Sequence, residues 1–135
     1  MTTVDHVGLS VADLAAAVVF YDAAFGFASE FAFELGRDEV RGAMLRHASG
    51  ARIELFERPG ADDGIQGRDP IGALATRGYG HVALATADLE ALHDHAVAAG
   101  ARSVFPPGQS PEPGVRFAFL ADPEGNLVEL VERAS

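Results

Sequence analysis

Hydrophobic and polar positions along this chain follow two periods, and the periods change in the same order twice. Residues Val4–Val11 alternate between hydrophobic and small or polar side chains, which predicts a short β-strand. Over Leu14–Phe25 the hydrophobic residues recur at helical spacing, with Asp13 as a start signal and Gly26 as a stop signal. Three further strands are predicted at Phe27–Phe33, Val40–Arg46 and Arg52–Glu57.

The second half of the chain repeats this βαβββ order. Strands are predicted at His81–Thr86, Arg102–Phe105, Arg116–Ala121 and Leu127–Glu132, with a helix at Leu89–Ala99. We therefore expect one functional domain made of a module at 1–58, a Gly-rich linker at 59–78 and a module at 79–135. One helical turn is expected around Ile71–Thr76, and the proline-rich segment Pro106–Gly114 is expected to be a stiff loop.

The two halves also share candidate chemistry. Two His and two Glu stand at the same offset of 75 residues (81 − 6 and 129 − 54): His6 matches His81, and Glu54 matches Glu129. Taken singly, a Glu on a strand usually faces water and a lone His is usually structural. Two His and two Glu in matching positions are instead a plausible ligand set for a divalent metal.

Strand alternation supports the ligand interpretation, because small residues accompany both His. His6 shares its face with Gly8 and Ser10, and His81 shares its face with two Ala, at 83 and 85. A sheet face that encloses a ligand needs such small side chains.

The composition excludes several classes of function. The chain has 135 residues and a net charge of −10, so the basic surface of a nucleic-acid or membrane binder is missing. It has no Cys, and all ten basic residues are Arg, which excludes thiolate and lysine chemistry. No segment reads as a membrane span or a signal peptide, so we expect a cytoplasmic protein.

Other polar residues have simpler explanations. Asp13 and Asp88 read as helix caps. The three remaining His, at positions 47, 93 and 95, are expected to be exposed to solvent, and Arg58 and Arg133 are expected on the surface.

These residues resemble the vicinal oxygen chelate superfamily, also called the glyoxalase, bleomycin-resistance and extradiol-dioxygenase superfamily. The resemblance rests on His6-Val-Gly-Leu, on Gly80-His81-Val-Ala-Leu and on the segment Asp122-Pro-Glu-Gly-Asn-Leu-Val-Glu129-Leu. It implies an α+β fold in which two βαβββ modules form a U-shaped, barrel-like mixed sheet around a metal site. The implied cofactor is one divalent metal (Zn, Ni, Co, Mn or Fe) and no organic cofactor, and its implied ligands are His6, Glu54, His81 and Glu129.

The same resemblance implies a reaction. A full His/Glu/His/Glu set is similar to glyoxalase I-type lyases and isomerases, which act on a small α-carbonyl substrate through an enediolate, with Glu129 or Glu54 as the base. The alternatives are an antibiotic- or small-ligand-binding resistance protein and a metal-dependent ring-cleaving dioxygenase. Similar glyoxalase I enzymes hold glutathione with an Arg where this chain has Ser10, and often carry an Asn where it has Arg58, so we expect weak or absent turnover with glutathione.

The substrate pocket is expected beside the metal, roofed by Pro106–Gly114, in a homodimeric protein. Aromatic walls with a few polar groups are the usual composition of such pockets. The candidate wall residues are Phe31, Phe33, Phe56, Phe117 and Phe119, and the candidates to hold a substrate carboxylate are Arg41, Arg52 and Arg116.

Overall fold

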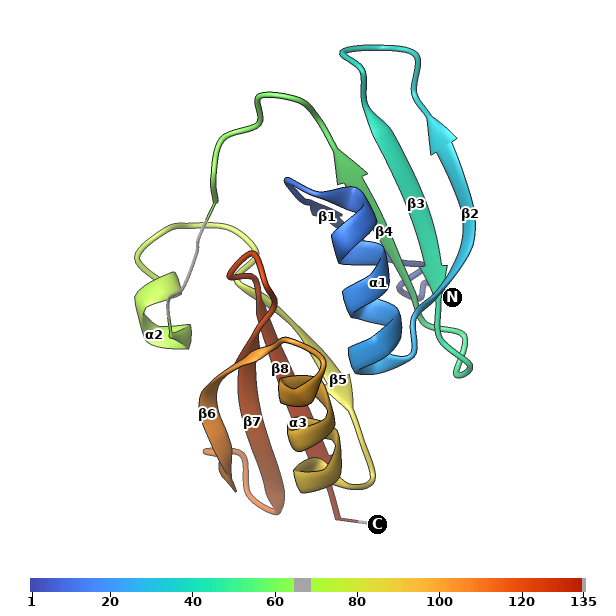
Figure 1. The fold of residues 1–135 in the computed structure, drawn as a ribbon. Helices are drawn as coiled ribbons and strands as arrows, with labels where there is room; N and C mark the ends of the chain where they lie inside the picture. Colours follow the sequence, from blue (N-terminus) through green and yellow to red (C-terminus); the bar gives the residue numbers. More distant parts are fainter. Residues whose placement is uncertain (65–68, 135) are drawn as a thin grey trace. The chain divides into compact units, whose positions relative to one another are not determined.

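The computed structural model describes residues 1–64 and 69–134, which divide into two compact units, Met1–Asp62 and Asp63–Ser135 (Figure 1). The first unit consists of β1 (Val7–Ser10), α1 (Leu14–Phe25), β2 (Ala28–Glu34), β3 (Arg41–Arg46) and β4 (Arg52–Glu57). The second consists of α2 (Pro70–Ala73), β5 (His81–Ala85), α3 (Leu89–Ala98), β6 (Arg102–Gln109), β7 (Val115–Ala121) and β8 (Leu127–Arg133).

Each unit contains one four-stranded mixed sheet, and the two sheets have the same topology. The strand order is β1-β4-β3-β2 in the first unit and β5-β8-β7-β6 in the second. The first strand of each module runs parallel to the last, and the other pairings are antiparallel. The predicted α+β class and the repeated βαβββ order are confirmed, and neither sheet closes on itself.

A helix covers one face of the sheet in the first unit. Asp13 caps α1 by accepting a hydrogen bond from the Ala16 amide, and Gly26 ends it in the left-handed conformation at φ 76°. The helix packs on β2, β3 and β4, where Leu45 and Leu55 are fully buried. Alternate residues of a strand share one face, so the buried residues Ile53 and Leu55 determine which face of β4 lies under α1.

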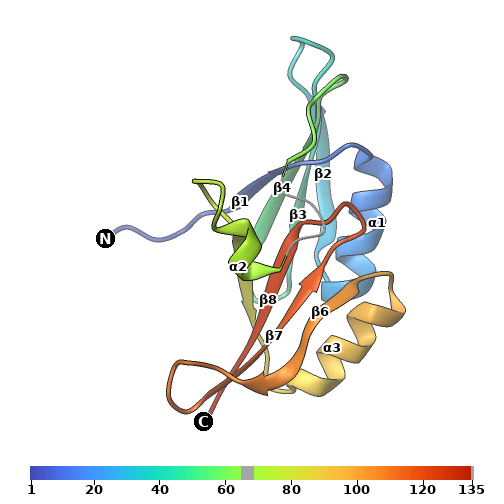
Figure 2. The same ribbon diagram turned by 90° about the vertical axis from the view of Figure 1, so that its left-hand side faces the viewer.

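The second unit buries both faces of its sheet in part. Helix α3 packs over one face, where Leu120 and Leu130 are fully buried. On the opposite face, Ala73 of α2 is in a cluster with Phe119, Ala121 and Leu127. Figure 2 shows α2 and α3 on opposite sides of this sheet. Among the described residues, no helix is long and hydrophobic enough to cross a bilayer.

One predicted loop is partly a strand. Residues 106–109 of the expected loop Pro106–Gly114 belong to β6, and only the residues from Ser110 to Gly114 connect β6 to β7. Proline removes a backbone donor, but β6 is an edge strand that pairs with β7 alone, so two adjacent prolines fit there. The pairing of β6 with β7 is irregular between Phe105 and Gly108.

Helices α1 and α3 each begin on a carboxylate from the last strand of their own module. The Leu14 amide donates to Glu57 Oε2 over 2.8 Å, and the Leu89 amide donates to Glu132 Oε2 over 2.8 Å. The Leu14 amide, and then the Arg41 guanidinium, hold the pKa of Glu57 below its usual value. A negative charge at a helix N-terminus satisfies a free amide and interacts well with the helix dipole.

We predict that Glu57→Gln lowers the free energy of unfolding by about 1 kcal/mol at pH 7, because the variant loses a charged acceptor for the Leu14 amide. The pKa of Glu57 is lower in the folded state, so its stabilisation is fully present above the unfolded value of 4.5 and is lost as the pH falls through the lower folded value. Urea unfolding at pH 7 and pH 4 should therefore show a smaller difference between variant and wild type at pH 4.

Glu112→Gln is the matched control, because Glu112 also pairs with an arginine, Arg133, but within the described residues its carboxylate does not accept a helix amide. Glu112→Gln should lower the free energy of unfolding at pH 7 clearly less than Glu57→Gln does. An equal cost for the two variants would contradict the helix-anchoring role of Glu57.

Candidate metal-binding pairs

The first unit brings His6 and Glu54 together. His6 immediately precedes β1, and the parallel register of β1 with β4 sets Gly8 opposite Glu54. Because Ile53 and Leu55 face α1, Glu54 must point to the opposite face of the sheet. There the His6 Nε2 atom lies 3.3 Å from Glu54 Oε1.

The second unit repeats this pair. His81 starts β5, and the register of β5 with β8 sets Ala83 opposite Glu129. The buried neighbours Val128 and Leu130 direct Glu129 away from α3. The His81 Nε2 atom lies 3.2 Å from Glu129 Oε2. Both Glu side chains are 21% exposed, so each pair is open to a ligand but is partly shielded from water.

The geometry of each pair fits two ligands of one metal ion. Two donors that are each about 2.1 Å from a metal lie about 3.0 Å apart at a right angle and about 3.4 Å apart at the tetrahedral angle. The observed separations of 3.3 and 3.2 Å lie in this range. Within residues 1–64 and 69–134, no three His, Cys, Asp or Glu side chains form a group that could hold a metal. Each unit therefore offers two candidate ligands.

His6 has a second carboxylate neighbour that the sequence analysis missed. Its Nδ1 atom lies 2.7 Å from Asp5 Oδ2, so the ring is between Asp5 on one side and Glu54 on the other. The hydrogen bond to Asp5, followed by the charge of Glu54, raises the pKa of His6, and the same hydrogen bond lowers the pKa of Asp5. The signal in the sequence was an acidic residue directly before a candidate ligand.

Aromatic side chains share the face of Glu54 in the first unit. Strand alternation and register place Phe31, Phe33 and Phe56 on that face. The rings of Phe31 and Phe33 are 6.0 Å apart, and those of Phe33 and Phe56 are 5.8 Å apart. Gly42 leaves room for this packing, since a Cβ atom there would lie 2.4 Å from the Phe33 ring.

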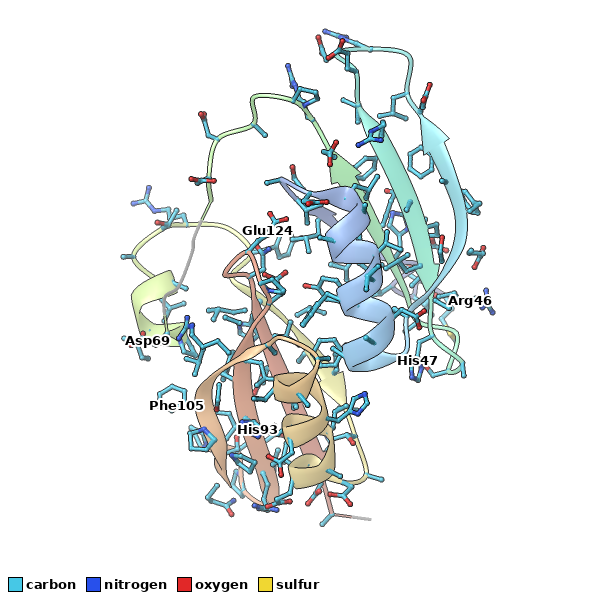
Figure 3. The ribbon with its side chains drawn as sticks, in the orientation of Figure 1. Arg46, His47, Asp69, His93, Phe105 and Glu124 are labelled. Carbon is cyan, nitrogen blue, oxygen red and sulfur yellow. The ribbon has the colours of Figure 1, made fainter. Side chains whose placement is uncertain are left out.

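The second unit has a matching aromatic group around Glu129. Phe119 lies opposite Glu129 in the register and contacts the His81 ring edge-to-face, with centroids 5.0 Å apart. The Phe117 ring is 5.9 Å from that of Phe119. Sequence reasoning missed Phe105 of β6, whose ring is 6.5 Å from that of Phe119 (Figure 3). The sequence predicted that this strand ends at Phe105, and it did not indicate that Phe105 lies opposite Phe119 in the sheet.

The three candidate arginines lie in different surroundings. Arg52 is on the face of Glu54 and donates to Glu30 over 2.9 Å. Arg41 is on the helix-covered face and pairs with Glu57, and Arg116 is on the corresponding face of the second unit and pairs with Glu90. Within its own unit, neither Arg41 nor Arg116 therefore lies on the face of the His–Glu pair.

Two of the remaining His differ from expectation. His93 was predicted to be exposed, and this prediction is wrong: the residue is only 8% exposed, and its Nε2 atom lies 2.7 Å from Ser103 Oγ (Figure 3). The hydroxyl gives the buried ring a polar partner, which sequence spacing could not show. His47 is half-buried against the ring of Phe27, with centroids 5.4 Å apart, where we expected an exposed turn.

The comparisons with known proteins agree with this fold. The chain is 29% identical over 130 residues to a protein of Vibrio cholerae named "Probable lactoylglutathione lyase", covering 94% of this chain and 88% of that protein. It is similar to the crystal structure of a glyoxalase family protein from Bacillus cereus, with 22% identity, a TM-score of 0.79, and coverage of 100% of this chain and 96% of that one.

A second similar structure is glyoxalase I from Zea mays, with 24% identity and a TM-score of 0.77. That match covers 97% of this chain but only 44% of the maize chain, so the present chain spans less than half of the maize enzyme. The sequence profile of the Glyoxalase/Bleomycin resistance protein/Dioxygenase superfamily matches residues 3–130. With two βαβββ units and this match over almost its whole length, the chain belongs to that superfamily.

Proposed function

We propose that the protein is a metal-dependent lyase or isomerase of the glyoxalase type that acts on a small α-carbonyl substrate. The observation that carries this proposal is the pair of equivalent His–Glu contacts, at 3.3 and 3.2 Å, on the sheet faces that carry aromatic side chains. Membership of the superfamily and the similarity to a protein named as a probable lactoylglutathione lyase support it.

His6, Glu54, His81 and Glu129 would together hold one divalent ion. Two neutral imidazoles and two carboxylates balance a 2+ charge, and such nitrogen and oxygen ligation suits Zn, Ni, Co, Mn or Fe. With an ion bound, such a site polarises a carbonyl oxygen and stabilises negative charge on it.

The protein residues then have two tasks. Glu54 or Glu129 accepts the proton from the carbon next to the carbonyl and returns it to the adjacent carbon, so the substrate is rearranged without net loss of a proton. The aromatic residues around each Glu, such as Phe33 and Phe119, contact the hydrophobic part of the substrate and exclude water.

We predict that the purified protein binds one divalent metal ion per chain, measured by elemental analysis and by calorimetric titration with Ni²⁺ or Zn²⁺. Glu54→Gln and Glu129→Gln should each weaken binding by at least about 100-fold, because loss of a neighbour that only supports a ligand already costs about 10–100-fold. Glu90→Gln, an exposed carboxylate paired with Arg116, is the control and should bind like wild type. Unchanged affinity in Glu129→Gln would contradict the ligand assignment.

We predict that the metal-loaded protein turns over methylglyoxal in the presence of a thiol other than glutathione. The absorbance of the thioester product measures this turnover. Glutathione should support weak turnover or none, because Ser10 supplies no positive charge for its carboxylate. If one Glu is the base, either Glu54→Gln or Glu129→Gln should lower kcat by about 10²–10⁴-fold. Full activity with glutathione would refute the Ser10 argument. No turnover with any thiol, together with tight binding of an aromatic ligand, would favour a ligand-sequestering protein.

We also propose that the protein is a homodimer. Each sheet is open and has two edge strands, which present unpaired backbone groups, and a second copy can cover them. Light scattering at micromolar concentration should give twice the mass of 14.1 kDa. A monomer mass under these conditions would contradict the proposal.

A further inference from the structure

The two candidate metal-binding His are oriented by different neighbours. In the His6 ring, Nδ1 lies 2.7 Å from Asp5 Oδ2, and Nε2 lies 3.3 Å from Glu54 Oε1. A neutral imidazole carries one N–H, and the hydrogen bond that it makes decides which nitrogen holds the proton. The contact with Asp5 is the shorter by 0.6 Å (3.3 − 2.7), so it favours a proton on Nδ1.

Asp5 is itself beside a partly buried arginine. The Arg52 side chain is 22% exposed, its Nη1 atom lies 3.9 Å from Asp5 Oδ2, and its Nη2 atom donates to Glu30 over 2.9 Å. Within the described residues, Arg52 Nε is a buried side-chain nitrogen without a hydrogen-bond partner, which is an energetic cost. A cationic group that is fixed by Glu30 therefore favours a charged Asp5 next to His6.

The second module lacks this arrangement. At the offset of 75 residues, Gly80 stands in place of Asp5 and Leu127 in place of Arg52. His81 instead lies edge-to-face against Phe119. Of the two candidate ligands, His6 is the one that has a carboxylate on Nδ1 within the described residues, so the βαβββ fold does not require this contact.

We propose that Asp5 is a positioning residue for His6: it keeps the proton on Nδ1, so that the lone pair of Nε2 is free to bind the metal ion. Arg52 supports Asp5 in this role. The proposal rests on the function proposed above for His6 and Glu54. A carboxylate behind a metal-binding imidazole fixes the ring and makes it a stronger ligand.

The first test is nitrogen NMR of the histidine side chains in the metal-free protein at pH 8.5, well above the ordinary imidazole pKa of about 6.5. We expect His6 to carry its proton on Nδ1 in the wild type. In Asp5→Ala the proton should move to Nε2, where Glu54 accepts it, whereas Asp5→Asn keeps an oxygen acceptor and should retain the Nδ1 proton in part. A wild-type proton on Nε2, or an unchanged ring in Asp5→Ala, would overturn the proposal.

Asp94→Ala is the matched control, because Asp94 is also an exposed acid next to a His in the sequence, with Oδ1 3.1 Å from His93 Nδ1. Asp94→Ala also removes one negative charge beside a His, and the proton of the His6 ring should stay on Nδ1. The signals of His81 should be the same in the two alanine variants and in wild type. These spectra also show that each variant is folded.

The second test is Zn²⁺ affinity, measured by competition with a chelating dye. Asp5→Ala should bind about 10–100-fold more weakly than wild type, and Asp94→Ala should bind equally well. Equal affinity of Asp5→Ala and wild type would overturn the positioning role. Failure of the wild type to bind Zn²⁺ or Ni²⁺ would instead refute the proposed metal function, and the tautomer of metal-free His6 would still decide whether Asp5 directs its proton.

Discussion

Alternation along the last strand of each module is the constraint on which the candidate site depends. In β4, Ile53 and Leu55 must be buried under α1, and the side-chain period of two then directs Glu54 to the other face. A shift of one residue in the register would place Glu54 in the hydrophobic core. The burial of two aliphatic side chains thus determines where a carboxylate can meet His6. The same argument applies to Glu129 between Val128 and Leu130.

The carboxylates at the ends of these strands connect the helix to the site. Glu57 and Glu132 accept the first amides of α1 and α3, from Leu14 and Leu89, both over 2.8 Å. Each lies three residues after the candidate ligand of its strand, on the opposite face. Within one module, the last strand therefore holds its helix with one Glu and presents another Glu to the face that carries the candidate ligands.

The modules have diverged where the fold allows it. Arg52 and Arg46 in the first module correspond to Leu127 and Ala121 in the second. The first pair lies near Glu30, at 2.9 and 3.9 Å, and the second is buried in the cluster that includes Ala73 of α2. One backbone arrangement thus carries a charged network beside His6 and a hydrophobic cluster in the equivalent place.

The sequence alone determined the local elements and the four residues at matching offsets, because strand and helix periods and cap residues are short-range signals. It predicted the starts of α1 and α3 and the strand Arg52–Glu57 as the structure has them. It also predicted Glu54 and Glu129 as metal ligands, and the structure places both on the sheet face opposite the helix. Only the tertiary structure decided which side chains meet. It brought Phe105 to Phe119, buried His93 against Ser103, and paired Arg41 with Glu57 on the helix-covered face. These contacts depend on strand register and on packing between distant segments, which no local pattern encodes.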